Sequence, residues 1–468
     1  MRQFLSALMK EGVLSIVMLL LLLLLVWGIA WYLRADNPDW MNLPVMISIA
    51  LVGAWAMMFV AQKVMAVKNA MRIEAQLKAQ SGAQLAGASA DKKGEIEAMR
   101  KKFDESLEAL KRTKGGKSAL FTLPWYVIIG PPGSGKTTAL QESGLNFPAS
   151  QGGAKVKGIG GTRNCDWWFT ADGILLDTAG RYTTVAEDHE EWFAFLDMIR
   201  TGRKQKPING TIVAVPVDEL MQATGAEIDK MAKDVRDRID ELASRLQAVF
   251  PVYMMFTKCD LVAGFVEFFE DFSKDERNQV WGFTFPYSLP DRQYTDLFDE
   301  ECDRMTGNLQ RRQLELLAAE RPPAKKQSIY LFPRQFQLAR GKMREFIQAL
   351  FGATAFQEAA VLRGIYFTSG TQKGTPIDQI LARMSTAMGM SMGDGGDERV
   401  EKKSFFINQL FTNIIFGDKT LARSSSKVIR KRRAWRLAVQ TLSLAVLAGG
   451  GRGRGGGLFQ KQIPGKRI

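Results

Sequence analysis

The residues with the clearest chemical meaning form the octapeptide Gly130-Pro-Pro-Gly-Ser-Gly-Lys-Thr137, which fits the phosphate-loop pattern G-x-x-x-x-G-K-[ST]. The apolar run Trp125–Ile129 precedes it, and a segment with helical residues follows. Glycines let such a loop curl until its N–H groups face phosphate oxygens, and the helix N-terminus adds further N–H groups. The alternative is a glycine-rich turn that matches the pattern by chance. The predicted nucleotide-binding residues of this loop are Gly130, Pro131, Pro132, Gly133, Ser134, Gly135, Lys136, Thr137 and Thr138.

A second motif, Asp177-Thr-Ala-Gly180, ends the apolar run that begins at Ile174. An acidic side chain at such a strand end can hold Mg²⁺, and the glycine N–H can contact a γ-phosphate. In the phosphate loop, the Thr137 hydroxyl is the expected Mg²⁺ ligand and Lys136 reaches the β- and γ-phosphates. The sequence therefore predicts Thr137 and Asp177 as metal ligands, and Gly180 as part of the nucleotide site.

A third motif, Thr257-Lys-Cys-Asp260, follows the apolar run Val252–Phe256 and resembles the N/T-K-x-D box by which GTPases read guanine. In that box the aspartate accepts hydrogen bonds from two guanine N–H groups, and the lysine stem lies along the base. Lys258 and Asp260 therefore favour GTP as the ligand. The box is short, so ATP stays open.

Catalysis is less clearly encoded than binding. In GTPases with the D-T-A-G motif, a glutamine that orients the attacking water commonly follows the glycine, and Arg181 stands at that position here. Arginine stays protonated, so Arg181 can stabilise phosphate charge or pair with an acid, but it cannot act as a base. Thr162 is a candidate switch residue on Mg²⁺, and a plain turn threonine is the alternative. Binding with slow hydrolysis is the resulting expectation.

Two uncharged runs near the N-terminus predict a membrane location. Gly12–Leu33 has 22 residues and Leu43–Ala61 has 19, and a helix needs about 20 apolar residues to cross a bilayer. They predict a transmembrane hairpin. Basic residues flank its two outer ends, whereas the connector Arg34–Asn42 contains two acids. The positive-inside rule then places both ends, and the nucleotide domain, in the cytoplasm.

The net charge of +14 over 468 residues raises the question of a nucleic-acid partner. Residues 418–468 hold 13 Lys and Arg against one acid, so the first 417 residues carry only +2. The cluster Arg430-Lys-Arg-Arg433 lies just before the apolar run Leu437–Ala448, which favours a cytoplasmic membrane flank over nucleic acid. With one histidine and three cysteines at no metal-like spacing, a zinc site is disfavoured.

The pattern divides the chain into five parts. Ser328–Phe332 and Leu362–Thr368 predict further buried strands, with a helix at Gln335–Phe351 between them. The predicted parts are a transmembrane hairpin (1–61, helices at about 12–33 and 43–61), a charged helical linker (62–118), an α/β P-loop domain of GTPase type (119–375), a helical cytoplasmic region (376–436), and a third transmembrane segment with a Gly/Arg tail (437–468). That last segment has the pattern expected of a truncated or frameshifted product, and a genuine Gly/Arg tail is the alternative.

Four stretches, Trp125–Thr138, Gly158–Phe169, Leu175–Thr183 and Leu362–Gln372, resemble the IcmF-like family. The resemblance implies a multi-pass scaffold protein of the bacterial inner membrane, in a type VI secretion system, with a nucleotide-binding domain in the cytoplasm. It also implies partners: a DotU/TssL-like inner-membrane protein, and the membrane complex and baseplate of the secretion system. Contact with a periplasm-facing lipoprotein is in doubt, because the family's large periplasmic region is missing from this sequence.

Three functions stay open from the sequence. The first is a scaffold with a nucleotide switch that uses Mg²⁺ and GTP or ATP. The second is an NTPase that energises assembly or transport, and the third is a structural anchor with a vestigial phosphate loop. Arg181 in place of glutamine favours the first. Arg181 lies within a stretch that resembles the IcmF-like family, so a feature shared by that family, and not a defect, is the alternative interpretation.

Overall fold

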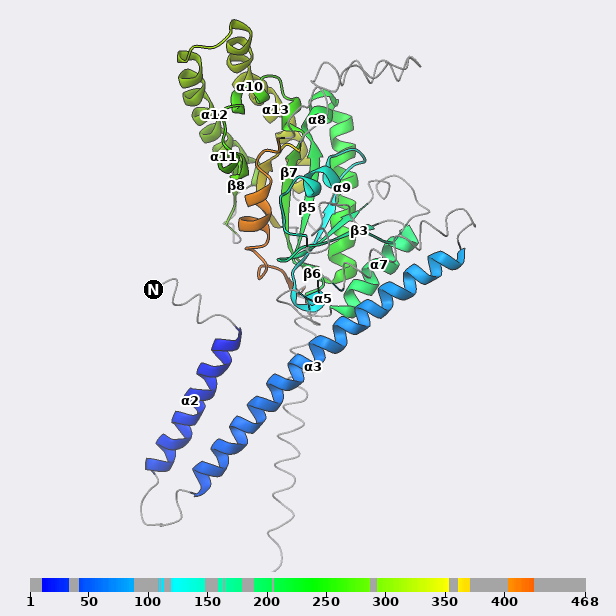
Figure 1. Ribbon diagram of the computed structural model, residues 1–468, viewed down its shortest axis with the longest axis vertical. Helices are drawn as coiled ribbons and strands as arrows, with labels where there is room; N and C mark the ends of the chain where they lie inside the picture. The colour runs from blue at the N-terminus through cyan, green and yellow to red at the C-terminus, as the bar shows by residue number, and fades with distance from the viewer. Residues whose placement is uncertain are drawn as a thin grey trace, which may run out of the picture.

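The computed structural model describes residues 11–32, 42–87, 119–147, 159–162, 165–178, 189–203, 206–286, 293–352, 361–370 and 403–424, together with positions 108, 110 and 112. Helices surround a central sheet (Figure 1). This sheet has eight strands in the order β2-β3-β4-β1-β5-β7-β9-β8. The inner strands are mutually parallel: β4 (Ile174–Thr178), β1 (Trp125–Ile129), β5 (Gly210–Pro216), β7 (Pro251–Thr257) and β9 (Val361–Phe367). The antiparallel strands at the two edges are β2 (Ile159–Thr162), β3 (Cys165–Phe169) and β8 (Gly282–Thr284). The predicted α/β class is confirmed.

Helices cover both faces of this sheet, so β1, β4, β5 and β7 are buried throughout and consist mainly of apolar residues. In β1, Trp125 and Val127 belong to the larger core, and Tyr126 and Ile128 to the core on the opposite face. The helices that contribute to the larger core are α5 (Ala119–Thr122), α7 (His189–Gly202), α8 (Val217–Gln222), α9 (Gly225–Leu246), α10 (Phe265–Phe269), α12 (Tyr294–Ala318) and α13 (Pro323–Phe351). The short helices η6 (Cys259–Leu261) and α11 (Lys274–Asn278) lie between β7 and β8.

The predicted strand at Ser328–Phe332 is wrong, because this segment lies inside α13. The buried side chains of α13 in this region include Ile329, Phe332 and Phe336. They recur at steps of three and four, which is the spacing of one helix face. A largely apolar run of five residues cannot by itself distinguish a strand from one side of a long helix. The predicted strand at Leu362–Thr368 is confirmed as β9.

Residues 403–424 complete the second face of the sheet. This segment contains a π-helix, η7 (Leu410–Ile415), and a short strand, β10 (Arg423–Ser424), that pairs with β6 (Ala248–Val249). The Tyr126 hydroxyl donates a hydrogen bond to the Ile415 carbonyl. These contacts join the segment to the same core as α6 (Lys136–Gln141). The α/β domain therefore includes residues beyond the boundary that the sequence placed at 375.

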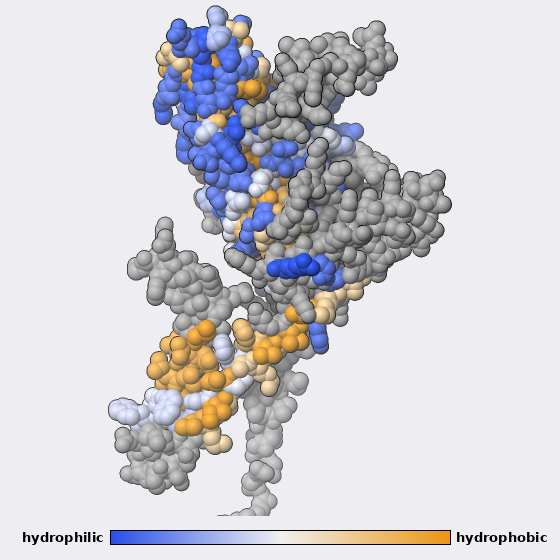
Figure 2. Space-filling view, viewed as in Figure 1, coloured by the Kyte–Doolittle hydropathy of each residue, from blue (hydrophilic) through white to orange (hydrophobic). Residues whose placement is uncertain are grey.

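The first two described helices are α2 (Glu11–Tyr32) and α3 (Asn42–Gly87), which contact each other. Among the described residues, Pro44–Ala61 is the one segment long and apolar enough to cross a membrane, and Leu19–Tyr32 is a shorter apolar stretch. Figure 2 shows apolar surface gathered over these two helices, whereas the coloured surface around α11 and α12 is mostly hydrophilic. The transmembrane hairpin stays a prediction. A membrane helix at about 43–61 would continue without a break to Gly87.

Candidate nucleotide-binding site

The predicted phosphate loop connects β1 to α6 at the carboxyl edge of the parallel strands. Gly133 and Gly135 have φ angles of +75° and +77°, which favour glycine over residues with a side chain. The Lys136 ammonium turns back into the loop and donates hydrogen bonds to the carbonyl oxygens of Gly130 and Pro131, each at 2.9 Å. The Lys136 side chain is thus buried, and its ammonium is hydrogen-bonded to two carbonyl oxygens of its own loop.

Two of the predicted metal ligands are in direct contact. The Thr137 hydroxyl donates a hydrogen bond of 2.7 Å to Oδ2 of Asp177, which places the phosphate loop against the end of β4. The other carboxylate oxygen, Oδ1, is buried and has no hydrogen-bond partner within the described part of the chain. Mg²⁺ prefers oxygen ligands, usually with one or two carboxylates. The oxygen atoms of Thr137 and Asp177 therefore fit a magnesium ion.

Burial shifts the pKa values of both charged groups at this point. It raises the pKa of Asp177 to about 6, even though the hydrogen bond from Thr137 and the charge of Lys136 act in the opposite direction. It lowers the pKa of Lys136 to about 8, against the attraction of Asp177 and Glu219. Burial therefore disfavours the charged form of each group. Shifted pKa values of this kind are common at functional sites.

Replacing Asp177 with asparagine is expected to stabilise the protein at pH 8. The native pKa is raised above the unfolded value, so the native state binds the extra proton between about pH 4 and pH 6. Stability therefore falls as the pH rises through this window, and the full cost is present above pH 6. Asparagine still accepts the Thr137 hydrogen bond but carries no charge. The thermal midpoint of the full chain in detergent should rise by roughly 2–6 °C at pH 8 and by much less at pH 5. The exposed carboxylate of Asp172 provides the control, Asp172→Asn. An equal gain at both pH values would contradict the prediction.

The predicted guanine box lies at the end of β7 and is joined to the phosphate loop. The Thr257 hydroxyl donates a 2.6 Å hydrogen bond to the Ser134 carbonyl. Lys258 adopts a left-handed conformation with φ +58° and is buried. Asp260 accepts a 2.6 Å hydrogen bond from the Ser369 hydroxyl at the end of β9. Burial raises the pKa of Asp260, and the Ser369 hydrogen bond acts against that shift.

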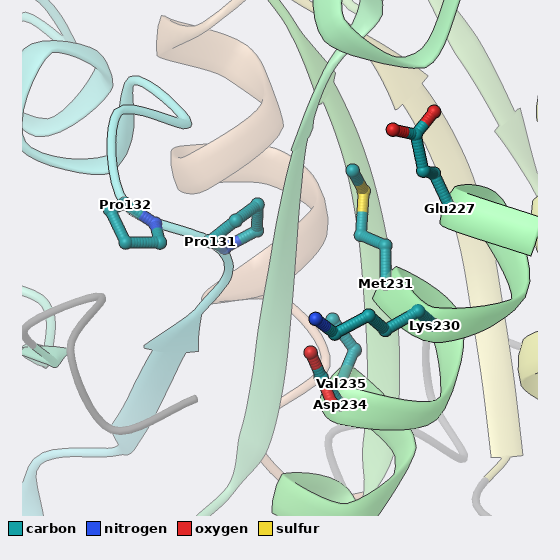
Figure 3. A pocket seen from close by; sticks show the side chains of 7 residues that line it. All are labelled: Pro131, Pro132, Glu227, Lys230, Met231, Asp234 and Val235. Atoms are coloured by element: carbon teal, nitrogen blue, oxygen red, sulfur yellow. The ribbon is translucent and has the colours of Figure 1, made fainter. Parts of the chain in front are cut away.

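A pocket of about 210 Å³ lies between the phosphate loop and α9. Figure 3 shows Pro131 and Pro132 on one side of it, and side chains of α9 on the other. Met231 and Val235 give the α9 wall its apolar part, and the charged lining residues are Glu227, Lys230 and Asp234. The two prolines of the phosphate loop therefore line a pocket whose other lining residues all belong to α9.

The structure brings most of the predicted site residues to one edge of the sheet. The phosphate loop follows β1, and Lys258 and Asp260 follow β7. Asp177 is the penultimate residue of the parallel strand β4. Thr138 lies beside the end of β9, since a Cβ at Gly370 would be 3.0 Å from its methyl group. Thr162 is the last residue of β2, and the structure describes its backbone only. Gly180 and Arg181 lie outside the described residues.

Sequence reasoning missed three residues at this edge. Ser369, which binds Asp260, follows β9, and Asp218 and Glu219 follow β5. The ends of parallel strands share an edge, and ligands of open α/β sheets bind there. The apolar run Ile212–Val217, with two acids directly after it, was the available signal.

The fold and the site define an α/β protein in which a glycine-rich loop with a buried lysine follows the first strand of a mostly parallel sheet. Residues 185–443 match the family model described as the IcmF-related N-terminal domain. The chain belongs to this family, which confirms the resemblance seen in the sequence.

The chain is 43% identical over 368 residues to the type VI secretion system component TssM1 of Pseudomonas aeruginosa strain PAO1. The match covers 76% of this chain and 33% of the relative, so the chain spans about a third of that protein's length.

Solved structures give weaker matches. The signal recognition particle receptor SRb-GTP/SRX complex of Chaetomium thermophilum has 19% identity and a TM-score of 0.20 over 31% of this chain and 76% of that one. A point mutant of NFeoB from S. thermophilus, bound to GDP, has 12% identity and a TM-score of 0.18 over 64% of this chain and 98% of that one.

Proposed function

We propose that the α/β domain binds GTP with Mg²⁺ at the carboxyl edge of its sheet and acts as a nucleotide-dependent switch. The observation that carries this proposal is the contact between Thr137 and Asp177, at 2.7 Å, beside an unpartnered buried carboxylate oxygen. Mg²⁺, when bound there, would neutralise charge on the β- and γ-phosphate oxygens. Lys136 would exchange its loop carbonyls for phosphate oxygens.

The preference for GTP over ATP rests on the guanine box. Asp260 is held by Ser369 at the same edge as the phosphate loop, and the adjacent Lys258 passes beside Gly135. A carboxylate accepts hydrogen bonds and donates none when ionised. It therefore suits the N1–H and N2–H groups of guanine better than the Watson–Crick edge of adenine, which has an acceptor at N1.

We also propose that the switch serves a type VI secretion system at the inner membrane. Support comes from the family, from the similarity to a protein named as a component of that system, and from the apolar segment Pro44–Ala61. The expected partners are a DotU/TssL-like membrane protein, the membrane complex and the baseplate. Slow hydrolysis is proposed, because Arg181 stands where a water-orienting glutamine is common.

The test is nucleotide binding to the full chain purified in detergent, with fluorescent GTP and Mg²⁺ and with ATP as competitor. Lys136→Ala should weaken GTP binding by about tenfold to a hundredfold, because charge-assisted hydrogen bonds to phosphate are lost. Lys233→Ala, which removes an exposed lysine of α9, is the control. Equal affinity for ATP would refute the guanine assignment. Absence of binding by the wild type would refute the switch and leave a structural anchor.

A further inference from the structure

An acidic pair follows β5 and contacts the lysine of the guanine box. The Lys258 ammonium lies 3.6 Å from Oδ1 of Asp218 and 3.5 Å from Oε1 of Glu219. The side chains differ in exposure: 9% for Lys258, 8% for Asp218 and 35% for Glu219. Lys258 and Asp218 therefore form a buried ion pair, and Glu219 joins it from the solvent side.

The Lys258 side chain is fixed along its length. Its Cγ lies 4.0 Å from the position of a Cβ on Gly135, so the stem passes beside the phosphate loop. Its ammonium then reaches α8, while the preceding Thr257 is hydrogen-bonded to Ser134. A free lysine side chain has four flexible bonds, and ordering it on ligand binding reduces affinity. Here the contacts with α8 hold the stem in place before a ligand arrives.

We propose that Asp218 is a positioning residue of the nucleotide site. It holds the Lys258 ammonium on α8, so that the methylene stem is extended where the nucleotide base is to lie. This role rests on the proposed function. Glu219 contributes less, because an exposed ion pair is screened by water, whereas removing one member of a buried pair leaves the other charge without compensation.

The proposed role of Asp218 concerns the contact of the protein with the nucleotide base and not its contact with the phosphates. Loss of Asp218 frees the Lys258 stem, which serves the base, but leaves the hydrogen bonds of Lys136 and Thr137 as they are. GTP should therefore be affected and inorganic tripolyphosphate should not. A residue that merely supported the fold of the phosphate loop would affect both ligands equally.

The experiment compares Asp218→Asn with the wild type, using the full chain in detergent. Fluorescent GTP is titrated directly with Mg²⁺, and inorganic tripolyphosphate is titrated as its competitor. The dissociation constant for GTP should rise about tenfold, while the inhibition constant of tripolyphosphate stays within about twofold. Glu219→Gln should give a smaller loss for GTP, and Asp229→Asn, an exposed acid of α9, is the neutral control.

Asp218→Asn leaves the Lys258 ammonium buried without its partner, which can destabilise the fold. A second variant therefore tests the proposal without this buried charge. The double variant Asp218→Asn/Lys258→Met has no buried charge in this pair and should show the same split between GTP and tripolyphosphate. Equal weakening of both ligands, or unchanged GTP affinity, would overturn the positioning role alone. Failure of the wild type to bind GTP would refute the proposed function, and this role with it.

Discussion

Changing Asp260 to asparagine is expected to move the preference of this protein from GTP to xanthosine triphosphate. Guanine presents N1–H and N2–H donors, which a carboxylate can accept, whereas xanthine has a carbonyl oxygen in place of the amino group. An asparagine amide offers one acceptor and one donor and so matches xanthine. The 2.6 Å hydrogen bond from Ser369 to Oδ1 orients the side chain in the wild type, and an amide oxygen can accept it equally.

The expected change in the ratio of the two affinities is about a thousandfold, because a mismatch leaves polar groups of the site and the base without partners. Competition of GTP and xanthosine triphosphate against a fluorescent nucleotide would measure it on the full chain. Asp296→Asn, at an exposed position of α12, should leave the ratio unchanged. Loss of GTP binding with no gain for xanthosine triphosphate would show that Asp260 does not read the base.

Gly130→Ala is expected to have the largest effect on stability. A Cβ at this position would lie 2.2 Å from the Ala214 carbonyl oxygen, which belongs to the backbone of β5. The φ angle of +155° is also one that residues with side chains rarely adopt. Because β1 and β5 pair in the sheet, relief of the clash requires the central strands to separate. We expect a destabilisation of about 3 kcal/mol or more and loss of GTP binding.

Gly307→Ala provides the matched comparison for this substitution. Gly307 lies within α12, and a Cβ there would meet nothing within 4 Å. Alanine is the better helix former, so the change should stabilise the protein by about 0.5–1 kcal/mol. Thermal unfolding of both variants in the same detergent measures the contrast. Similar midpoints for Gly130→Ala and the wild type would contradict the close packing of the loop against β5.

The sequence alone placed the motifs, because each lies at the end of an apolar strand or directly after it. Thr137 and Asp177 are in contact, and their role as metal ligands stays a prediction. The sequence was insufficient for Asp218 and Ser369, which reach this edge because β5 lies beside β1 and β9 beside β7. Strand order depends on pairing between distant segments, and no local pattern of one sequence encodes it.

The membership of residues 403–424 in the sheet domain was missed for a similar reason. Their apolar residues predicted a helix, but not the surface on which it packs. Two tyrosines of the sheet provide that surface: Tyr126 donates its hydrogen bond to Ile415, and Tyr253 donates one of 3.2 Å to Asp418. Arg363 of β9 also pairs with Asp418 at 2.7 Å. These contacts span sequence separations that only the folded chain reveals.

The length of α3 has a mechanical consequence. Its 46 residues, at a rise of 1.5 Å each, form a rod about 69 Å long. One part carries the apolar segment Pro44–Ala61, while α3 also packs against α5 and α7 of the sheet domain. Because the described helix has no break, a rotation of the sheet domain that carried α3 with it would tilt the apolar segment by the same angle.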